Sequence, residues 1–193
     1  MFEISDPIEV KIIVVGSLKS GKSSLVRRMV GDGFSLNYTP TRGCDVYEMI
    51  TVLKCTGRRF HVFIWDTSGI EAYAELTRSY LKGAAAAIIT CPLEGELGEE
   101  SVKQSVNNIR SECGPIPILV ARTISDQRTR GTNTDRRSLN DSVPSIDVSA
   151  RDGYNVQYLL DSLLLEITRH HQLIGTRVDI PIPELTNLMR QST

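Results

Sequence analysis

The 193-residue chain has no long hydrophobic run, few cysteines and almost no net charge. Its longest apolar runs, such as Ile12–Val15 and Ala84–Ile89, are much shorter than the ~20 residues of a membrane-spanning helix, so we expect no such span. The 22 basic and 23 acidic residues leave a formal charge of −1, which argues against a nucleic-acid binder that relies on a basic field. The opening residues lack the basic and apolar segments of a secretory signal.

The four cysteines and three histidines are too dispersed to predict a disulfide or a metal centre. No C-x-x-C pair occurs, so reduced thiols in a cytosolic protein are the expected state. The histidines have no partner at ligand spacing, and we predict no metal site built from protein ligands alone. With 40% hydrophobic and 23% charged residues, the composition is that of an ordinary globular protein.

What the sequence does contain is a regular alternation of strand and helix patterns. Buried strands are predicted at Val10–Val15, Ala84–Thr90 and Ile116–Val120. A hairpin is predicted from two extended segments, Asp45–Lys54 and Arg59–Trp65, which a turn separates. The alternation indicates an α/β chain with a largely parallel sheet covered by helices.

Helix patterns lie between and after these strands, at Ser23–Val30, near Glu99–Cys113 and at Val156–Ile167. In the last of these, apolar residues recur with the period of one helix face. Between Ser125 and Ser145, polar residues dominate with almost no apolar periodicity. A helix there would bury little, so we predict a frayed helix or a mobile loop.

The most specific motif is a G-x-x-x-x-G-K-[ST] loop that follows a predicted strand and opens a helix. It consists of Gly16, Ser17, Leu18, Lys19, Ser20, Gly21, Lys22 and Ser23, and Ser24 follows it. The glycines let backbone N–H groups point at a phosphate, Lys22 places a cation on the terminal phosphates, and the Ser23 hydroxyl can ligate Mg²⁺. The loop predicts binding of a nucleoside triphosphate and leaves the base, and the choice between kinase and switch, open.

Three further motifs follow in a characteristic order: Phe34–Thr41, Trp65–Gly69 and Ser149-Ala150-Arg151. With the phosphate loop, their order and spacing resemble the small GTPases of the Ras superfamily. Residues 41–46 are similar to the T-I-G-V-D-F segment of Rab proteins, and residues 73–84 to the end of their second switch. The resemblance is therefore strongest to the Rab branch.

The resemblance implies a P-loop NTPase small-GTPase fold. In that fold a mostly parallel six-stranded sheet has one antiparallel edge strand and helices on both faces. The similarity covers about residues 10–170, which we expect to form the G domain. Residues 1–9 are then a short N-terminal extension, and residues 171–193 a C-terminal tail.

The resemblance also implies roles for the metal and for the terminal phosphate, with GTP or GDP and Mg²⁺ as cofactors. Ser23 and Thr41 would bind Mg²⁺ through their hydroxyls, and Asp66 would hold it through a water. The N–H groups of Thr41 and Gly69 would contact the γ-phosphate.

On the base side, Phe34 would pack against the guanine. The loop of Ser149, Ala150 and Arg151 would read the guanine oxygen through backbone N–H. Partners are implied as well: Val46, Trp65 and Tyr80 occupy the positions of the apolar triad that effector proteins contact. An exchange factor and an activating protein are further expected partners, and no nucleic acid is.

The chain departs from the family pattern on its catalytic side. Ile70 occupies the position of the glutamine that orients the attacking water, and isoleucine can neither donate nor accept a hydrogen bond. We therefore predict slow intrinsic GTP hydrolysis, which a partner's own glutamine could restore. Leu18, where the family has a small residue, would crowd the γ-phosphate and an incoming arginine. Its neighbour Lys19 adds charge near the phosphates or points to water.

The base-reading N-K-x-D motif is also altered, to Thr123-Ile124-Ser125-Asp126. Asp126 can still accept two hydrogen bonds from guanine. Thr123 cannot replace the asparagine amide, and losing a buried polar contact costs about 1–3 kcal/mol. We predict weakened rather than abolished nucleotide binding, roughly tenfold to a hundredfold.

The sequence offers no site for a lipid anchor. The last cysteine is Cys113, and Phe2 stands where myristoylation needs glycine. We therefore expect a cytoplasmic protein whose association with membranes depends on partners.

Two functions remain open at this stage. The first is a Rab-like switch in membrane or intracellular trafficking that binds GTP and GDP. The second is a pseudo-GTPase, an interaction module locked in one state within a trafficking or ciliary complex. A small-molecule kinase is disfavoured by Trp65–Gly69 and by the lack of an arginine-rich lid.

Overall fold

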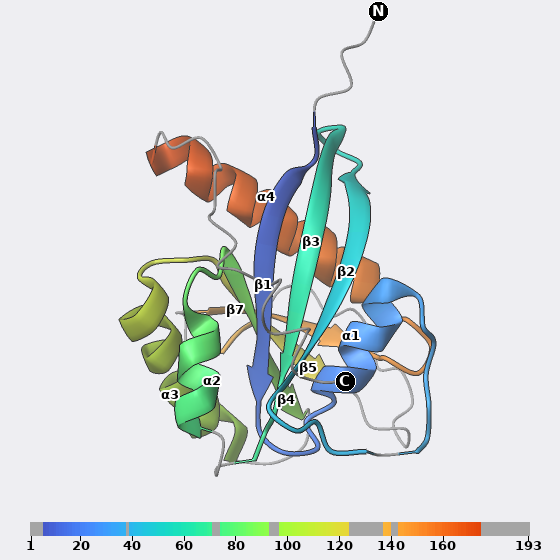
Figure 1. Cartoon of the computed structure of the whole chain (residues 1–193), viewed down its shortest axis with the longest axis vertical. Helices are drawn as coiled ribbons and strands as arrows, with labels where there is room; N and C mark the ends of the chain where they lie inside the picture. The colour runs from blue at the N-terminus through green and yellow to red at the C-terminus, as the bar shows by residue number, and fades with distance from the viewer. Residues whose placement is uncertain are drawn as a thin grey trace, which may run out of the picture.

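A single mixed sheet runs through the molecule (Figure 1), and the computed structural model describes residues 6–37, 39–70, 74–92, 97–123, 137–139 and 143–174. The strands are β1 (Ile8–Gly16), β2 (Cys44–Leu53), β3 (Arg58–Thr67), β4 (Ala86–Pro92), β5 (Ile118–Thr123), β6 (Arg137–Leu139) and β7 (Val143–Val148). The helices are α1 (Lys22–Val30), α2 (Ala74–Leu81), α3 (Leu97–Cys113) and α4 (Val156–Ile174).

The strand order is β2-β3-β1-β4-β5-β7-β6. Strands β3, β1, β4, β5 and β7 pair in parallel, and β2 pairs antiparallel with β3 as the predicted hairpin. The predicted mostly parallel sheet with an antiparallel edge strand is confirmed, and so are the helices on both faces.

The predicted count of six strands omitted β6, which pairs antiparallel with β7 at the opposite edge of the sheet. Backbone hydrogen bonds join this three-residue strand to the sheet. Because such pairing does not require apolar side chains, the sequence shows no pattern that predicts the strand. It and the start of β7 lie in the segment predicted as a frayed helix or loop, so that prediction is wrong for residues 137–139 and 143–145. Residues 125–136 and 140–142 of the segment lie outside the described residues.

Element boundaries differ slightly from those the sequence predicted. Strand β1 begins at Ile8, within the predicted N-terminal extension, and α4 continues to Ile174, within the predicted tail. Within the described ranges, no helix has both the length and the apolar character needed to cross a bilayer.

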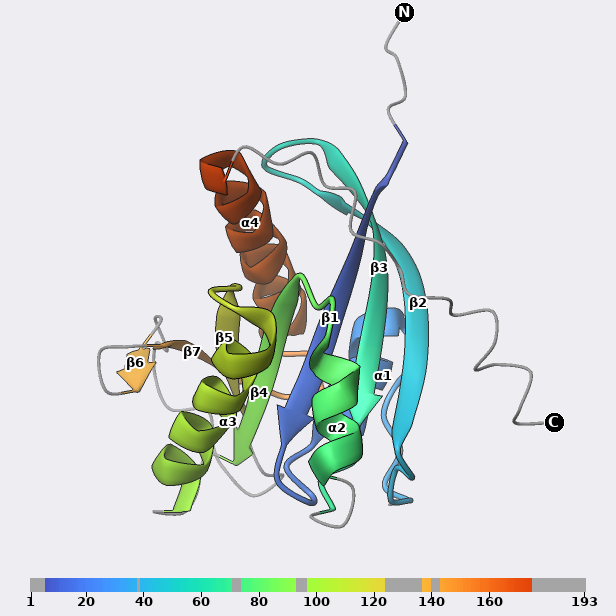
Figure 2. The ribbon, with the colours of Figure 1, turned by 60° about the vertical axis from the view of Figure 1, so that its left-hand side comes forward.

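The sheet is buried on both faces, as Figures 1 and 2 show by the helices on either side. Val10, Ile12 and Val14 of β1 belong to the core formed with α1 and α4, whereas Ile13 and Val15 belong to the core formed with α2 and α3. Because alternate residues enter different cores, the second half of β1, Ile12–Val15, is an unbroken apolar run. The parallel strands end at one edge of the sheet, and the loops that follow them meet there.

Candidate functional site

The loop between β1 and α1 requires glycine at its first and sixth positions. At Gly16, with φ +149°, an added Cβ would lie 2.4 Å from Thr90 Oγ1 and 2.5 Å from the Thr90 carbonyl oxygen. Gly21 caps α1 in the left-handed conformation, with φ +87°. The tight packing of this loop on β4 therefore explains the glycine at position 16, and the left-handed backbone explains the one at 21.

The Lys22 ammonium is held at the centre of this loop. Its Nζ donates to the carbonyl oxygens of Gly16 at 3.0 Å and Ser17 at 2.8 Å. Burial lowers the pKa of Lys22, and the nearby Asp66 carboxylate opposes that shift. The loop thus surrounds one buried cation, an arrangement suited to binding an anion.

Three oxygen-bearing side chains from distant segments meet beside this cation. Ser23 Oγ lies 3.1 Å from Thr41 Oγ1, and the Thr41 hydroxyl donates to Asp66 Oδ2 at 3.4 Å. Asp66 is fully buried, and within the described part of the chain its Oδ1 has no hydrogen-bond partner. Burial raises the pKa of Asp66, against the hydrogen bond from Ser23 and the charge of Lys22.

This oxygen set fits a hard cation. Carboxylate and hydroxyl oxygens are the ligands that Mg²⁺ takes in proteins. The free lone pairs of the buried Asp66 oxygen are what such an ion, or its bound water, would satisfy. The three predicted metal residues are therefore brought together by α1, the segment before β2, and β3.

A cavity of about 420 Å³ opens next to these oxygens. Its volume lies in the range of small-molecule sites. Nine of the predicted nucleotide-binding residues line it, and seven of them come from the phosphate loop, the start of α1 and the segment after that helix: Leu18, Lys19, Gly21, Lys22, Ser23, Ser24 and Phe34. Thr41 and Gly69 complete the predicted set in this lining.

Gly69 lies directly against the phosphate loop. An added Cβ there would come within 2.6 Å of Lys22 Nζ and 2.7 Å of Leu18 N. The segment after β3 therefore reaches the same point as the loop after β1. Ile70, which follows, is half-buried and lines a neighbouring groove together with Ser17 and Leu18.

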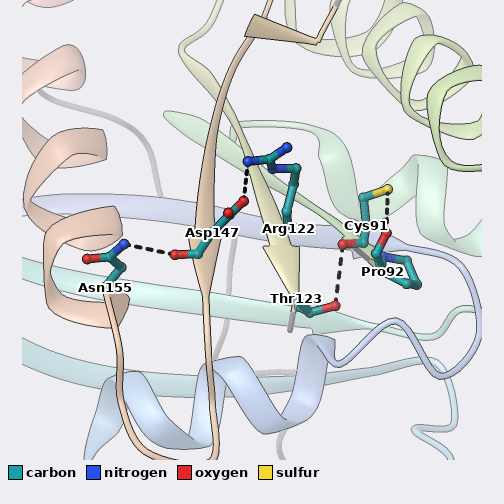
Figure 3. A network of polar contacts seen from close by, with 6 residues as sticks. All are labelled: Cys91, Pro92, Arg122, Thr123, Asp147 and Asn155. Atoms are coloured by element: carbon teal, nitrogen blue, oxygen red, sulfur yellow. Dashed lines mark hydrogen bonds and ion pairs between the residues drawn. The ribbon is translucent and has the colours of Figure 1, made fainter. Parts of the chain in front are cut away.

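Thr123, the first residue of the altered base motif, is engaged with the protein itself. Its hydroxyl lies 3.0 Å from the Ser20 carbonyl oxygen and 3.3 Å from that of Cys91 (Figure 3). The side chain thus ties the end of β5 to the phosphate loop and to β4. Asp126, the other base-motif residue, lies outside the described residues.

The Ser149–Arg151 loop is held from α1. Arg28 Nε donates to the Ala150 carbonyl oxygen at 2.6 Å, and Arg28 also donates to the Arg151 carbonyl. The loop is closed by the backbone hydrogen bond from Ser149 to Tyr154, of 3.0 Å. Neither this loop nor Thr123 appears in the described lining of the cavity, whereas Phe34, also predicted for the base, does.

Comparisons with known proteins agree with this arrangement. A sequence model of the Ras family matches residues 11–169. The chain belongs to the Ras family. It is 32% identical to Ras-related protein Rab-22A of Canis lupus familiaris over 168 residues, which is 83% of this chain and 82% of that protein. It is 31% identical to Ras-related protein Rab-31 of Mus musculus over 167 residues, 82% and 83% of the two chains.

These relatives identify the Ras-family chain as a Rab-like GTP-binding switch protein, and guanine-nucleotide binding follows from the family. The residues predicted for effector contact come together in this Rab-like structure. Val46 pairs with Trp65 across β2 and β3, and the Trp65 and Tyr80 ring centroids lie 5.7 Å apart. Trp65 is only 8% exposed, so Val46 and Tyr80 carry more of the accessible surface.

A buried lysine supports this aromatic pair in the Ras-family chain. Lys11 Nζ lies 4.0 Å from the centroid of the Trp65 ring and donates to the Lys82 carbonyl oxygen at 2.8 Å. Burial lowers the pKa of Lys11. A charge over an aromatic face is attracted to it, so the lysine holds the indole in place.

Arg27 and Arg28 are among the site residues that the sequence analysis missed. Arg27 lines the cavity, and its place four residues after Ser23, on the same face of α1, was a usable signal. Arg28 supports a loop more than 120 residues away in the chain, and no local pattern could have predicted this contact.

Proposed function

We propose that this Rab-like protein binds GTP or GDP together with Mg²⁺ in the cavity beside the phosphate loop, hydrolyses GTP slowly and recruits effector proteins. The observation that carries the proposal is the meeting of Ser23, Thr41 and Asp66 next to Lys22. In this proposal the G domain, predicted over residues 10–170, extends to Ile8, where β1 begins, and to Ile174, where α4 ends.

The phosphates would be held by charge and by backbone N–H groups. Lys22 supplies the buried cation, and the N-terminus of α1 adds the N–H groups that a helix leaves unpaired. Mg²⁺, when bound, supplies a charge that neutralises the phosphate oxygens. Ser23 and Thr41 would orient it through their hydroxyls, and Asp66 through its free oxygen.

Switching would follow from the two segments that meet at the cavity. Thr41 lies before β2 and Gly69 after β3, and both line the cavity beside Lys22. A terminal phosphate at this point gives both segments acceptors, and its loss removes them. Effectors would then distinguish the two states through Val46, Trp65 and Tyr80, which lie on β2, β3 and α2.

Slow hydrolysis is proposed from the residue after Gly69. Ile70 offers no side-chain donor or acceptor to orient a water. We expect Ile70→Gln to increase single-turnover hydrolysis of bound GTP by at least roughly tenfold, while Ile70→Leu, a matched apolar change, leaves it unchanged. An unchanged rate in Ile70→Gln would contradict this assignment.

The first test is the nucleotide content of freshly purified protein, released by denaturation and resolved by ion exchange. Bound GTP near one per chain would mean that binding survives and hydrolysis is blocked. Bound GDP would mean that the protein cycles. If Asp66→Ala binds GTP as tightly as the wild-type protein with Mg²⁺ present, the proposed metal site is refuted.

A second candidate, the pseudo-GTPase module of a trafficking or ciliary complex, is favoured by Thr123. Its hydroxyl is occupied by protein carbonyls, which leaves the base motif with less to offer the guanine. For this function the protein would be purified without nucleotide and bind its partners equally with GDP and GTP. Partner binding that depends on the nucleotide would exclude it. In either case contact with membranes would be made through partners.

A further inference from the structure

Two opposite charges are buried side by side near the ends of β5 and β7. Arg122 and Asp147 are the second-last residues of their strands and are register partners. The Arg122 guanidinium and the Asp147 carboxylate form an ion pair, with side chains only 16% and 7% exposed (Figure 3). None of the roles proposed above uses this pair.

The pair lies on the apolar face of the sheet that α3 covers. Alternation along the strands places Arg122 on the same face as Val120, and Asp147 on that of Val143, and both valines belong to the core with α3. Arg122 Nε has no hydrogen-bond partner in the part of the chain that the structure describes. Asp147 therefore provides the charge that compensates the buried guanidinium.

Such a pair is poor evidence for stability. Taking two charges out of water costs about as much as their attraction returns, and apolar residues of similar size often serve as well. An ion pair can instead favour one register of the two strands over the alternatives. Strands β5 and β7 share only four register pairs, from Val120 with Ser145 to Thr123 with Val148. A two-residue slip would place Arg122 opposite Ser145 and leave two buried charges unpaired.

The register matters because both strands lead into the segments that face the base. Thr123 follows Arg122 and is bonded to the phosphate loop. Ser149 follows β7, and the Asp147 carbonyl oxygen accepts from Asn155 Nδ2 at 2.9 Å, which ties the far side of that loop to the same residue (Figure 3). The ion pair thus sits where the two segments diverge from adjacent strands.

We infer that Arg122 and Asp147 are positioning residues that hold Thr123 and the Ser149–Arg151 loop in register, and that they thereby set how well the site distinguishes guanine from adenine. This inference rests on the proposed function, because it takes those segments to read the base. The pair acts through the segments and does not touch the nucleotide itself.

The test compares GDP with ADP, whose base carries an amino group in place of the oxygen that the Ser149–Arg151 loop would read. Dissociation constants for both are measured with Arg122→Met, Asp147→Asn and the apolar double variant Arg122→Met/Asp147→Leu. We expect the wild-type protein to prefer GDP by roughly tenfold or more. Each single variant should lose most of that preference, mainly through weaker GDP binding.

The double variant and a control separate positioning from simple loss of stability. The double variant should regain thermal stability, because no charge is left unpaired, and should still lack the preference for GDP. Leu53→Ala, a core change in β2 near the hairpin turn, should lower the melting temperature and keep the preference. A double variant that recovers the preference, or a Leu53→Ala protein that loses it, would overturn the inference. A wild-type protein that binds GDP and ADP equally would refute base reading itself, and the inference with it.

Discussion

On the phosphate side of the site, Lys22, Ser23 and Thr41 line a cavity, whereas on the base side Thr123 and the Ser149–Arg151 loop are not part of its lining. Beside this cavity the fully buried Asp66 carboxylate has one oxygen without a hydrogen-bond partner in the described part of the chain. The Thr123 hydroxyl is hydrogen-bonded to two backbone carbonyl oxygens, and the Ala150 carbonyl oxygen accepts a hydrogen bond from Arg28. The phosphate side therefore leaves space for a ligand, whereas these base-side groups stabilise the protein's own structure.

This difference indicates which part of a nucleotide dominates binding. Phosphate and metal binding depend on charge, on backbone N–H groups and on a few oxygens, all of which this chain keeps. Base reading depends on side-chain groups that donate and accept in one pattern, and here one of them is replaced. The comparison predicts that substitutions on the phosphate side have the larger effects on affinity.

Lys22→Ala should produce the largest loss. It removes the buried cation that would face the terminal phosphates, so we expect affinity for GDP and GTP to fall by at least roughly a hundredfold. Binding is measured with a fluorescent guanine nucleotide in Mg²⁺. Lys103→Ala removes an exposed lysine from α3 and serves as the control, with unchanged affinity. Equal effects of Lys22→Ala and Thr123→Val would erase the contrast between the two sides.

Gly16→Ala tests how rigidly the phosphate side is built. The new Cβ would lie 2.4 Å from Thr90 Oγ1, so β1 and β4 must separate, and we expect the free energy of unfolding to fall by at least about 2 kcal/mol. Gly57→Ala in the hairpin turn is matched in having a positive φ, +69°, but meets nothing within 4 Å. It should cost only about 1 kcal/mol. The free energy of unfolding of both variants is measured by urea denaturation. Similar decreases in the two variants would show that packing against Thr90 is not the reason for glycine at position 16.

Thr123→Val tests the base side with a smaller expected effect. The change keeps the shape and removes the donor to Ser20, so stability should fall by about 1 kcal/mol and GDP affinity by up to roughly tenfold. Thr168→Val removes a similar buried hydroxyl contact, to the Leu164 carbonyl oxygen within α4. It should cost as much stability without changing GDP affinity. If both variants bind GDP alike, Thr123 does not support the nucleotide site.

The sequence predicted the phosphate side better than the base side, for a physical reason. The loop from Gly16 to Ser23 is one continuous segment, so its spacing carries the geometry. The hydrogen bond from Arg28 to Ala150 and the ion pair of Arg122 with Asp147 join segments far apart in the chain. Such contacts depend on the strand order and leave no local pattern.

The same reasoning applies to the fold. The core strands and α4 were predictable because burial imposes an apolar pattern on each of them. Strand β6 was not, since backbone pairing with β7 holds its three residues. The surroundings of Trp65 were only partly predictable, because its position predicted an effector contact whereas no local pattern predicted Lys11 over its ring.

The smallest predicted effect concerns pH and the metal oxygens. Burial raises the pKa of Asp66 above its ordinary value of 3.8, so the nucleotide-free folded protein keeps a proton that the unfolded chain has released. The free energy of unfolding should therefore decrease as pH rises from below 3.8 through the raised pKa. Asp66→Asn lacks this component, so the stability of the variant relative to wild type should increase over that range.

Urea midpoints of both proteins, measured across this range without nucleotide, test the prediction. Other carboxyl groups titrate in both proteins and cancel in the difference between the two curves. Mg²⁺ competes with the proton for the carboxylate, so it should stabilise the wild-type protein more as pH rises, and Asp66→Asn much less. A midpoint difference that does not change with pH would mean that burial leaves Asp66 charged, with its charge already balanced by Lys22. The phosphate side would then need no metal ion to be electrostatically complete, and its contrast with the base side would rest on Lys22 alone.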